Sequence, residues 1–224
     1  MKVGIIGSTG RMGAVLTDLI LSSENFDLSG GISSKNSRED LENVVKESEI
    51  LIDFSTPIAT FDALEVAVRH KKAFITGTTG FSVEDMVKMR GYARSIPILH
   101  ASNFSLGIQL IGLLLEKSAN ALSDFDFAII DKHHNRKKDA PSGTALFLEN
   151  QAGRKAQIVS LRLGNIFGEH SCEFASENEV LTFSHSALNR RVFAEGALNC
   201  AHWLVDRGAG FYSMRDYLSE KIGV

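Results

Sequence analysis

The sequence predicts an α/β protein with two parts: an N-terminal doubly wound parallel sheet and a second domain of the α+β type. Three observations predict it. The chain opens with an apolar strand, a glycine-rich turn and an amphipathic helix. Short apolar strands then alternate with helical patterns up to about residue 103, as in a parallel sheet. Further along, strand patterns follow one another without this alternation.

Composition limits the class of protein before any motif is considered. The 224 residues are 44% hydrophobic and 23% charged, which is typical of a globular protein. The formal net charge of -3 provides no general attraction to nucleic acid or to an anionic membrane, so we expect neither as a partner. The start of the chain lacks the pattern of a signal peptide, and residues 104–115 are too few to cross a bilayer. We therefore expect a cytoplasmic protein in which Cys172 and Cys200 are buried, reduced thiols.

The glycine-rich turn is the first candidate binding element. It follows the strand at residues 2–6 and reads Gly7-Ser8-Thr9-Gly10-Arg11-Met12-Gly13. Glycines allow backbone amides to approach a pyrophosphate, and the positive end of the following helix attracts it. The spacing is Gly-x-x-Gly-x-x-Gly rather than Gly-x-Gly-x-x-Gly, so a tight turn without a ligand is the alternative. This opening is typical of a Rossmann-like dinucleotide-binding unit.

The second strand, at residues 27–32, bears on the choice of cofactor. A carboxylate commonly follows this strand and binds the ribose hydroxyls of NAD. Here the chain has Ser33, Ser34 and Lys35, two hydroxyls and an ammonium that would accept a 2′-phosphate. The pattern favours NADPH over NADH, with ordinary polar loop residues as the alternative.

The remaining strands of the first part end in small and polar residues. We predict strands at 50–54, 73–76 and 96–99, and helices that begin after the caps Thr56 and Ser82. Ligands of parallel sheets lie outside the carboxyl ends of the strands. The residues expected there, besides the two loops already described, are Gly77, Thr78, Thr79, Ala101, Ser102, Asn103 and Phe104.

The second part begins near Asn103 and contains the most reactive stretch of the chain. We predict a helix at 105–121, a strand at 125–130, a helix from about Thr144, strands at 156–163, 171–175 and 180–186, a helix at 191–206 and a short helix capped by Ser213. Between the first strand and the following helix, residues 131–145 read Asp-Lys-His-His-Asn-Arg-Lys-Lys-Asp-Ala-Pro-Ser-Gly-Thr-Ala.

Residues 131–145 combine positive charge with groups that transfer protons. Ser142 can cap the next helix, whose first amides together with the basic side chains would bind an anion such as a carboxylate. Histidine can donate or accept a proton near neutral pH when its pKa is unperturbed, and His133 and His134 should point in opposite directions if the backbone is extended. An exposed basic loop is the alternative. The spacing of histidines, cysteines and carboxylates argues against a metal site.

The segment from His133 to Ala145 resembles the signature of the 4-hydroxy-tetrahydrodipicolinate reductase (dihydrodipicolinate reductase) family. The resemblance covers essentially the whole chain in order. Other matching stretches are Gly7 to Gly13, Asp53-Phe54-Ser55, Gly77 to Gly80, Asn103 to Ser105, Ser160-x-Arg162-x-Gly164, Gly168-x-His170, Arg190 to Ala197 and Ser213 to Asp216.

The resemblance implies a reaction and a set of roles. A cyclic dicarboxylate loses water to give a conjugated imine, to which a nicotinamide hydride is added. His133 is then the proton donor and acceptor, and Lys137 a second proton donor that also holds a carboxylate. Substrate would bind to His134, Gly143 and Thr144, in the turn capped by Ser142, with Arg190 as a further anion contact. The cofactor would lie on Gly7 to Met12, Gly77 to Thr79 and Ala101 to Phe104.

The resemblance also implies an organisation. A dinucleotide-binding domain at residues 1–103 would receive the C-terminal segment 196–224, and a substrate-binding and oligomerisation domain at 104–195 would assemble a homotetramer through its sheet. Closure of the two domains would be part of the mechanism. Two alternatives remain open: another NAD(P)-dependent oxidoreductase acting on an imine or carbonyl dicarboxylate, and a non-catalytic nucleotide-sensing regulator, although no helix-turn-helix is apparent.

Two departures from the family pattern bear on the cofactor. Ser33 stands where members that use NADH well commonly carry an acidic residue, and the stretch around residues 36–46 is abbreviated.

Overall fold

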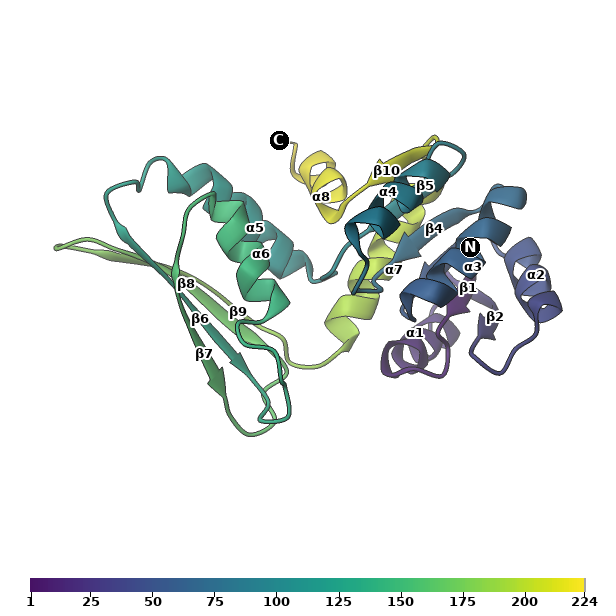
Figure 1. Ribbon diagram of the computed structural model, residues 1–224, viewed down its shortest axis with the longest axis horizontal. Helices are drawn as coiled ribbons and strands as arrows, with labels where there is room; N and C mark the ends of the chain where they lie inside the picture. Colours follow the sequence, from purple (N-terminus) through teal and green to yellow (C-terminus); the bar gives the residue numbers. More distant parts are fainter. Residues whose placement is uncertain (224) are drawn as a thin grey trace. The chain divides into compact units, whose positions relative to one another are not determined.

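The chain folds into two compact units, which are described separately. The structure is a computed structural model that describes residues 1–223. Unit 1 contains residues 1–104 together with the C-terminal stretch that begins at Phe193, and unit 2 contains Ser105–Val192 (Figure 1). None of the helices in the described part of the chain is long and apolar enough to cross a membrane.

Unit 1 is built on a six-stranded sheet with the order β10-β5-β4-β3-β1-β2, in which every neighbouring pair is parallel. The strands are β1 (Lys2–Ile6), β2 (Asp27–Ile32), β3 (Ile50–Asp53), β4 (Ala73–Thr76), β5 (Pro97–His100) and β10 (Gly210–Tyr212). The predicted doubly wound sheet is therefore confirmed. The sixth strand, β10, was not predicted, because three residues that begin with glycine produce no recognisable apolar alternation.

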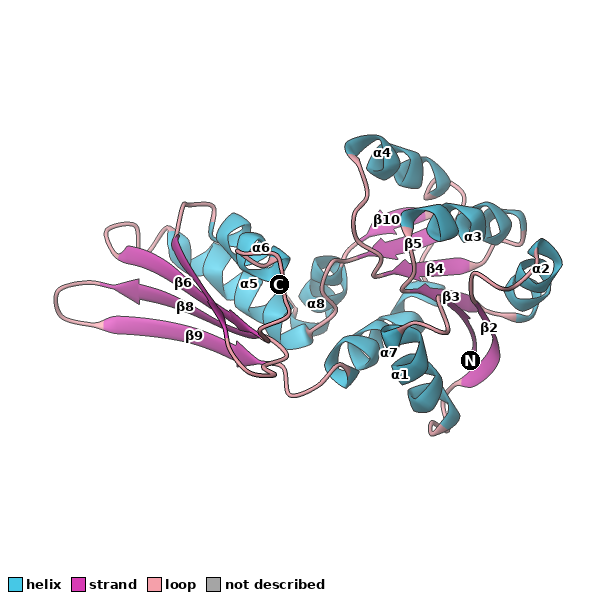
Figure 2. Cartoon of the chain, turned by 60° about the horizontal axis from the view of Figure 1, so that its bottom comes forward, coloured by secondary structure: helices cyan, strands magenta, loops and turns pink. Residues whose placement is uncertain are grey.

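Helices cover both faces of this sheet (Figure 2). They are α1 (Arg11–Leu21), α2 (Arg38–Glu47), α3 (Pro57–Arg69), α4 (Val83–Tyr92), α7 (Arg191–Val205) and α8 (Met214–Ile222). Helices α2, α3 and α4 share one apolar core with the sheet, in which Leu41, Leu64 and Met89 pack on Leu51 and Phe74. Helices α1 and α7 lie on the opposite face. Short connections at the carboxyl ends of the strands thus remain open to a ligand.

Side-chain caps determine where several helices begin. Ser37, Ser82 and Ser213 each form a capping box with an aspartate three residues later. Thr56 caps α3, and Pro57 occupies its first position. The predicted starts after Thr56, Ser82 and Ser213 are confirmed. Helix α2 was not predicted, because the stretch around residues 36–46 was interpreted only as abbreviated relative to the family.

Unit 2 is a four-stranded mixed sheet covered on one face by two helices (Figure 1). The strands are β6 (Asp126–His133), β7 (Gln157–Arg162), β8 (Glu169–Ala175) and β9 (Val180–Ser186), in the order β7-β6-β8-β9, and the helices are α5 (Leu106–Ala119) and α6 (Gly143–Ala152). Strand β7 is parallel to β6, whereas β8 and β9 are antiparallel to their neighbours. Phe127 and Phe174 stack in the core with ring centroids 4.5 Å apart, and Ile129 and Leu148 are completely buried.

Strand β6 extends three residues further than the predicted strand at residues 125–130. The polar residues Asp131 and Lys132 gave little strand signal. They nevertheless pair with β7 on one side and β8 on the other, as the central position of β6 allows. Since side chains alternate along a strand, Phe127, Ile129, Asp131 and His133 share the buried face. The sequence had suggested that His133 lies on a turn between a strand and a helix. The structure instead places it on the strand β6.

Candidate active site

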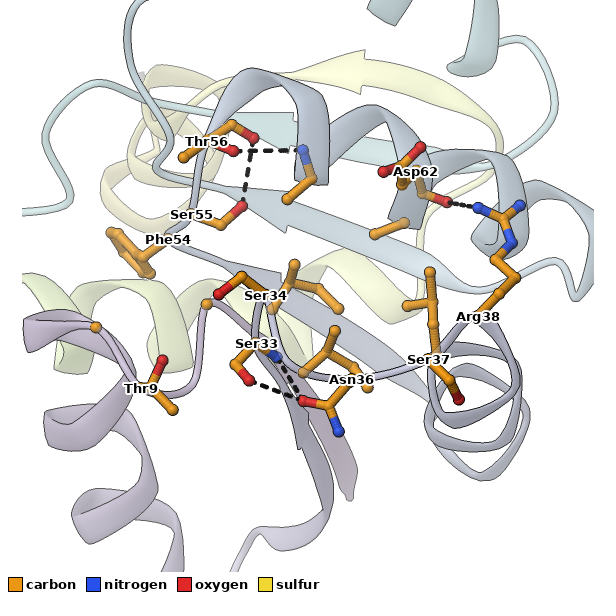
Figure 3. A pocket seen from close by; sticks show the side chains of 17 residues that line it. Thr9, Ser33, Ser34, Asn36, Ser37, Arg38, Phe54, Ser55, Thr56 and Asp62 are labelled. Carbon is orange, nitrogen blue, oxygen red and sulfur yellow. Dashed lines mark hydrogen bonds between the residues drawn. The ribbon is translucent and has the colours of Figure 1, made fainter.

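A cavity of about 540 Å³ lies at the carboxyl ends of β1, β2 and β3 in unit 1 (Figure 3). Strands β1 and β3 are neighbours, and the chain leaves them toward opposite edges of the sheet, so the cavity occupies the topological switch point. Its size falls within the usual range of ligand pockets. It is lined by Ile6, Gly7, Thr9, Gly10, Ile32, Ser33, Ser34, Asn36, Ser37, Arg38, Leu41, Phe54, Ser55, Thr56, Ala59, Asp62 and Ala63.

Two glycines of the turn, Gly7 and Gly13, have no room for a side chain. Gly7 has a φ of +83°, and a Cβ there would lie 2.4 Å from the carbonyl oxygen of Phe54. A Cβ on Gly13 would lie 2.3 Å from the carbonyl oxygen of Gly7, so α1 packs directly against the turn. Both requirements match the roles of glycines in dinucleotide-binding turns, despite the unusual spacing. The residues present therefore fit the pyrophosphate of a dinucleotide cofactor.

The cavity includes some of the residues predicted to bind the cofactor. Gly7, Thr9, Gly10, Ser33 and Ser34 line it, whereas Ser8, Arg11, Met12 and Lys35 do not. The lining also includes residues that the sequence did not single out, among them Asn36 and Arg38. Asn36 accepts hydrogen bonds from the backbone amide and the hydroxyl of Ser33, both at 2.9 Å (Figure 3). Ser37 and Asp40 form a capping box at the start of α2, and this pattern in the sequence would have placed Arg38 in the first turn of a helix beside the cavity.

The loops after β4 and β5 do not line the cavity, but they are connected to it through Asp53. The carboxylate of Asp53 is completely buried at the end of β3. It accepts hydrogen bonds from the hydroxyls of Ser55, Thr60 (2.6 Å), Thr76 (2.7 Å) and Thr78 (2.9 Å). Burial raises the pKa of this carboxyl, and the four hydroxyl donors oppose that effect. The carboxylate thus ties the Gly77–Thr79 loop to the residues beside the cavity.

The loop after β5 is held by close backbone packing. The amide of Ala101 donates to the carbonyl oxygen of Thr76 at 3.1 Å, and the rings of Phe54 and Phe104 meet edge to face at 5.7 Å. A Cβ on Gly196 of α7 would lie 1.8 Å from the carbonyl oxygen of Phe104. The predicted cofactor residues Ala101, Ser102, Asn103 and Phe104 thus occupy the carboxyl end of a parallel strand.

Asp131 and His133 are the centre of the candidate site in unit 2. Asp131 is completely buried, and the side chain of His133 is 10% exposed. His133 Nδ1 lies 2.6 Å from Asp131 Oδ1, although neither atom meets the angular geometry of a standard hydrogen bond. The ring of His170 packs edge to face against His133, with centroids 5.2 Å apart. With Nδ1 turned toward the carboxylate, Nε2 is the nitrogen of His133 left for a substrate.

The surroundings of Asp131 favour its ionised form. Its Oδ2 accepts hydrogen bonds from the amide of Ser142 (2.8 Å), the hydroxyl of Ser160 (3.0 Å) and the guanidinium of Arg162 (3.4 Å). Burial alone would raise the pKa of this carboxyl, but these donors together with His133 outweigh it and lower the pKa. Burial lowers the pKa of His133, Asp131 opposes the shift, and Lys137 adds to it.

The predicted substrate-binding residues follow His133 along the chain. Lys137 Nζ lies 2.8 Å from Asp139 Oδ2, with a side chain 24% exposed. Ser142 caps α6 through the amide of Ala145 and lies 3.2 Å from His170 Nε2, so Gly143 and Thr144 form the first turn of that helix. His134 is half-buried after the end of β6. The guanidinium of Arg190 lies over the ring of Phe167 at 5.6 Å.

Asp131 thus brings together residues that the sequence analysis treated separately. His133 and Ser142 both contact it, and Lys137 lies close enough to influence the charge of His133. Asp131, Ser160, Arg162 and His170 were not predicted as site residues. They meet only because β6 pairs with β7 and β8 in a register that places Asp131 opposite Ser160 and His170.

Asp131, His133 and His170 also lie close enough to one another to resemble a metal site, with their ligand atoms within 4.8 Å. The adjacent charges argue against a cation here. The guanidinium of Arg162 lies 3.4 Å from Asp131, and the ammonium of Lys137 acts on His133. Three donors already occupy Asp131 Oδ2. We therefore describe the cluster as an acid–base site.

Comparisons with known proteins show which family the chain belongs to. Residues 1–104 match the family described as dihydrodipicolinate reductase, N-terminus, and residues 107–218 match dihydrodipicolinate reductase, C-terminus. The chain is 40% identical to a 4-hydroxy-tetrahydrodipicolinate reductase of Zymomonas mobilis, with 97% of each chain covered. A protein of the same name from Rickettsia canadensis is 37% identical, over 96% of this chain and 98% of the other.

A solved structure shows the same fold. The dipicolinate-bound dihydrodipicolinate reductase from Paenisporosarcina sp. TG-14 superposes with a TM-score of 0.81 at 22% identity, over 95% of this chain and 97% of that one.

The doubly wound unit with its switch-point cavity, together with the histidine site of the second unit, defines an oxidoreductase that uses a nicotinamide dinucleotide. The two family matches and the sequence identity to its relatives then show the family of this oxidoreductase. The chain belongs to the dihydrodipicolinate reductase family. The resemblance noted in the sequence is thereby confirmed.

Proposed function

We propose that this protein reduces 4-hydroxy-tetrahydrodipicolinate, by way of dihydrodipicolinate, to tetrahydrodipicolinate in the diaminopimelate route to lysine. The observation that carries the proposal is His133. It is a buried histidine held beside a buried carboxylate, and the cationic segment of residues 132–138 and the capped start of α6 follow it directly. Its relatives carry the name of this activity.

The substrate has two carboxylates, and unit 2 supplies complementary groups. Lys137 and His134 provide positive charge or hydrogen-bond donors, and the first turn of α6 at Ser142, Gly143 and Thr144 provides the positive end of a helix. Arg190 is proposed as a further anion contact. Since Lys137 is already paired with Asp139, a substrate carboxylate would compete for an ammonium that is held in place. The arrangement favours a small dianion over a neutral molecule.

The reduction adds one hydride and one proton across the conjugated imine. A nicotinamide dinucleotide bound in unit 1 supplies the hydride. His133 is proposed to supply the proton from Nε2, with Lys137 as a second donor, because the electron density added to the substrate must be neutralised by a nearby acid. The same cationic residues stabilise negative charge that develops as the hydride arrives.

NADPH is the proposed preferred cofactor. Residues 33–38, which directly follow β2, contain no carboxylate, and Ser33, Ser34 and Arg38 line the end of the cavity there. These groups can donate hydrogen bonds to a 2′-phosphate, which a carboxylate in this position would repel. Lys35 lies in the same loop and would strengthen the local field. Gly77 to Thr79 and Ala101 to Phe104 are proposed to contact the rest of the cofactor.

A cytoplasmic homotetramer is the proposed form of the enzyme. The open face of the unit 2 sheet, opposite α5 and α6, carries Val159, Leu161 and Val180, which are 42%, 38% and 64% exposed. Apolar side chains on an exposed sheet face are typical of an interface between copies of a chain. In the cytoplasm Cys172 and Cys200 would remain as the buried thiols that they are here.

The decisive experiment follows the absorbance of NADPH and of NADH with the product of dihydrodipicolinate synthase as substrate. We expect oxidation of both cofactors. Folded protein that oxidises neither would refute the proposal. Oxidation only with a different imine or carbonyl dicarboxylate would favour the alternative oxidoreductase.

His133→Gln tests the proposed acid in the same assay. We expect kcat to fall by about 10²- to 10⁴-fold with little change in KM, the usual contribution of a proton donor. His202→Gln is the control, because His202 is an exposed histidine on α7. A His133→Gln enzyme within about threefold of the wild-type kcat would remove His133 from the role of proton donor.

A further inference from the structure

Asp131 is the feature of unit 2 that the proposed chemistry does not yet use. It is a charged side chain with no exposed surface, two residues before His133 on the same strand and the same face. Burying a carboxylate costs free energy unless hydrogen bonds and opposite charges compensate for it. Here they do so from three elements of the fold: β7 through Ser160 and Arg162, the start of α6 through Ser142, and β6 through His133.

The two carboxylate oxygens of Asp131 have different partners. Oδ2 receives the three hydrogen bonds, whereas the contact partners of Oδ1 are imidazoles: His133 Nδ1 at 2.6 Å and His170 Nε2 at 3.9 Å. The side chain is therefore fixed by one oxygen while the other faces His133. A carboxylate beside Nδ1 favours the tautomer that carries its proton on Nδ1 and stabilises the imidazolium once Nε2 is protonated.

His170 completes the pocket around the imidazole of His133. Burial, followed by the nearby His133, lowers the pKa of His170 to about 4, so this ring is neutral near pH 7. It packs against His133 and contacts the hydroxyl of Ser142. Of the two imidazoles beside Asp131, His133 is the closer to Oδ1, at 2.6 Å against 3.9 Å, and is the one whose protonated form the carboxylate stabilises more. The other charged groups near His133 are Lys137 and Arg162, and both disfavour its protonation.

We infer that Asp131 is a positioning residue, which holds His133 with Nδ1 inward and Nε2 toward the substrate and at the same time anchors the first turn of α6. The inference rests on the proposed function, in which His133 is the proton donor and that turn holds a carboxylate. One buried carboxylate thus connects the acid to the anion-binding turn. Displacing it disturbs both, even though Asp131 itself touches neither substrate nor cofactor.

The test replaces Asp131 with asparagine, which has nearly the same shape without the charge. We expect the kcat of Asp131→Asn to fall by about 10²-fold, because the wrong tautomer and a weaker acid remove much of what a proton donor contributes. The limb of the pH–rate profile on which activity is lost as pH rises should move to lower pH, since the carboxylate that favours imidazolium is gone. Asp126→Asn is the matched control, an exposed aspartate on the same strand, and should match the wild type.

The state of the imidazole is measured without turnover. Nitrogen-15 NMR of the wild type should show neutral His133 with its proton on Nδ1, with the resonance assigned by its loss in His133→Gln. In Asp131→Asn the titration of His133 should move to lower pH. A proton on Nε2 in the wild type, or an unmoved titration in the folded variant, would overturn the inference. Metal analysis showing one divalent ion per chain, lost in Asp131→Asn, would also overturn it.

Failure of the inference and failure of the proposed function can be distinguished. A wild-type enzyme without reductase activity would refute the function, whereas the tautomer and the titration of His133 would still be measurable. If Asp131→Asn does not fold, the tautomer in the wild type decides the question alone. Ser160→Ala provides a milder second variant, because it removes one of the three donors to Oδ2 and leaves the carboxylate in place.

Discussion

Each unit buries an aspartate near the carboxyl end of a strand, and the two carboxylates have opposite surroundings. Asp53 in unit 1 is surrounded by four hydroxyl donors, from Ser55, Thr60, Thr76 and Thr78. Asp131 in unit 2 is surrounded by a backbone amide, one hydroxyl, a guanidinium and an imidazole. The pKa of Asp53 is raised by its burial, whereas the pKa of Asp131 is lowered because its donors outweigh its burial.

The difference indicates two uses of a buried acid. Hydroxyls can satisfy a carboxyl whether or not it is ionised, because each can donate or accept. Asp53 therefore suits the task of holding loops together. A guanidinium and an imidazolium favour the ionised form, so Asp131 suits a site in which charge is used. Substitutions around Asp53 in unit 1 should therefore lower stability, whereas substitutions around Asp131 in unit 2 should lower the rate of turnover.

The largest effect is expected from Lys137→Ala in unit 2. Loss of the proposed second proton donor and carboxylate ligand should reduce kcat by about 10³-fold. The affinity of unit 1 for NADPH, measured by fluorescence titration, should stay within about twofold of the wild type. Lys138→Ala is the matched control, because the adjacent Lys138 is exposed. Equal losses in the two variants would mean that the charge of the segment matters and the position of Lys137 does not.

Asp53→Ala should lower the free energy of unfolding more than removal of any single hydroxyl that donates to Asp53. The variant leaves the hydroxyls of Thr60, Thr76 and Thr78 buried without their acceptor. We expect the free energy of unfolding to fall by about 3 kcal/mol, measured by urea denaturation. Asp27→Ala, at the exposed start of β2, should change it by less than about 0.5 kcal/mol. A small loss in Asp53→Ala would show that these hydroxyls find other partners.

The pH dependence of stability should have opposite signs for the two carboxyls. Asp53, with a raised folded-state pKa, contributes stability that is present below the unfolded value of about 3.9 and lost as pH rises through its folded pKa. Asp131, with a lowered pKa, contributes stability that is present above about 3.9 and lost as pH falls through its folded pKa. As the pH is lowered from neutral, the Tm difference between the wild type and Asp131→Asn should therefore become smaller. The Tm difference between the wild type and Asp53→Asn should become larger. If the two variants showed the same change of Tm with pH, the proposed difference between Asp53 and Asp131 would be contradicted.

The smallest effect is expected at the adenosine end of the unit 1 cavity. Arg38→Ala should raise the KM for NADPH by about fivefold and leave the KM for NADH nearly unchanged, as expected for one exposed charge-assisted hydrogen bond. Lys35→Ala should also weaken NADPH selectively but less, because Lys35 does not line the cavity. Equal losses for both cofactors would argue against a contact with the 2′-phosphate.

The sequence predicted the parts of the fold that depend on local pattern. Apolar alternation located the first five strands of unit 1, and Ser82 and Ser213 marked the starts of their helices. Strand β10 and the last three residues of β6 were missed, because their strand state comes from pairing with neighbours and their composition gives no signal.

The site was predictable to the same extent. His133, Lys137 and Ser142 stand close together in the sequence, and their chemical character identifies the segment. Ser160, Arg162 and His170 could not be related to it by spacing, since they reach Asp131 only through the register of three strands. Likewise, Arg38 was not assigned to the cavity from the sequence, because its position depends on the start of α2.

The spacing of Asp131 and His133 has a consequence for how such an enzyme can vary. Two residues apart on one strand, they occupy the same face, and a slip of one residue in β6 would send both to the opposite face together. A one-residue insertion in β6 ahead of Asp131 would therefore remove the acid and its carboxylate in a single event, whereas the loop at residues 134–141 could change length without separating them. For anyone grafting this chemistry onto another sheet, the unit to transplant is the strand with both of its neighbours.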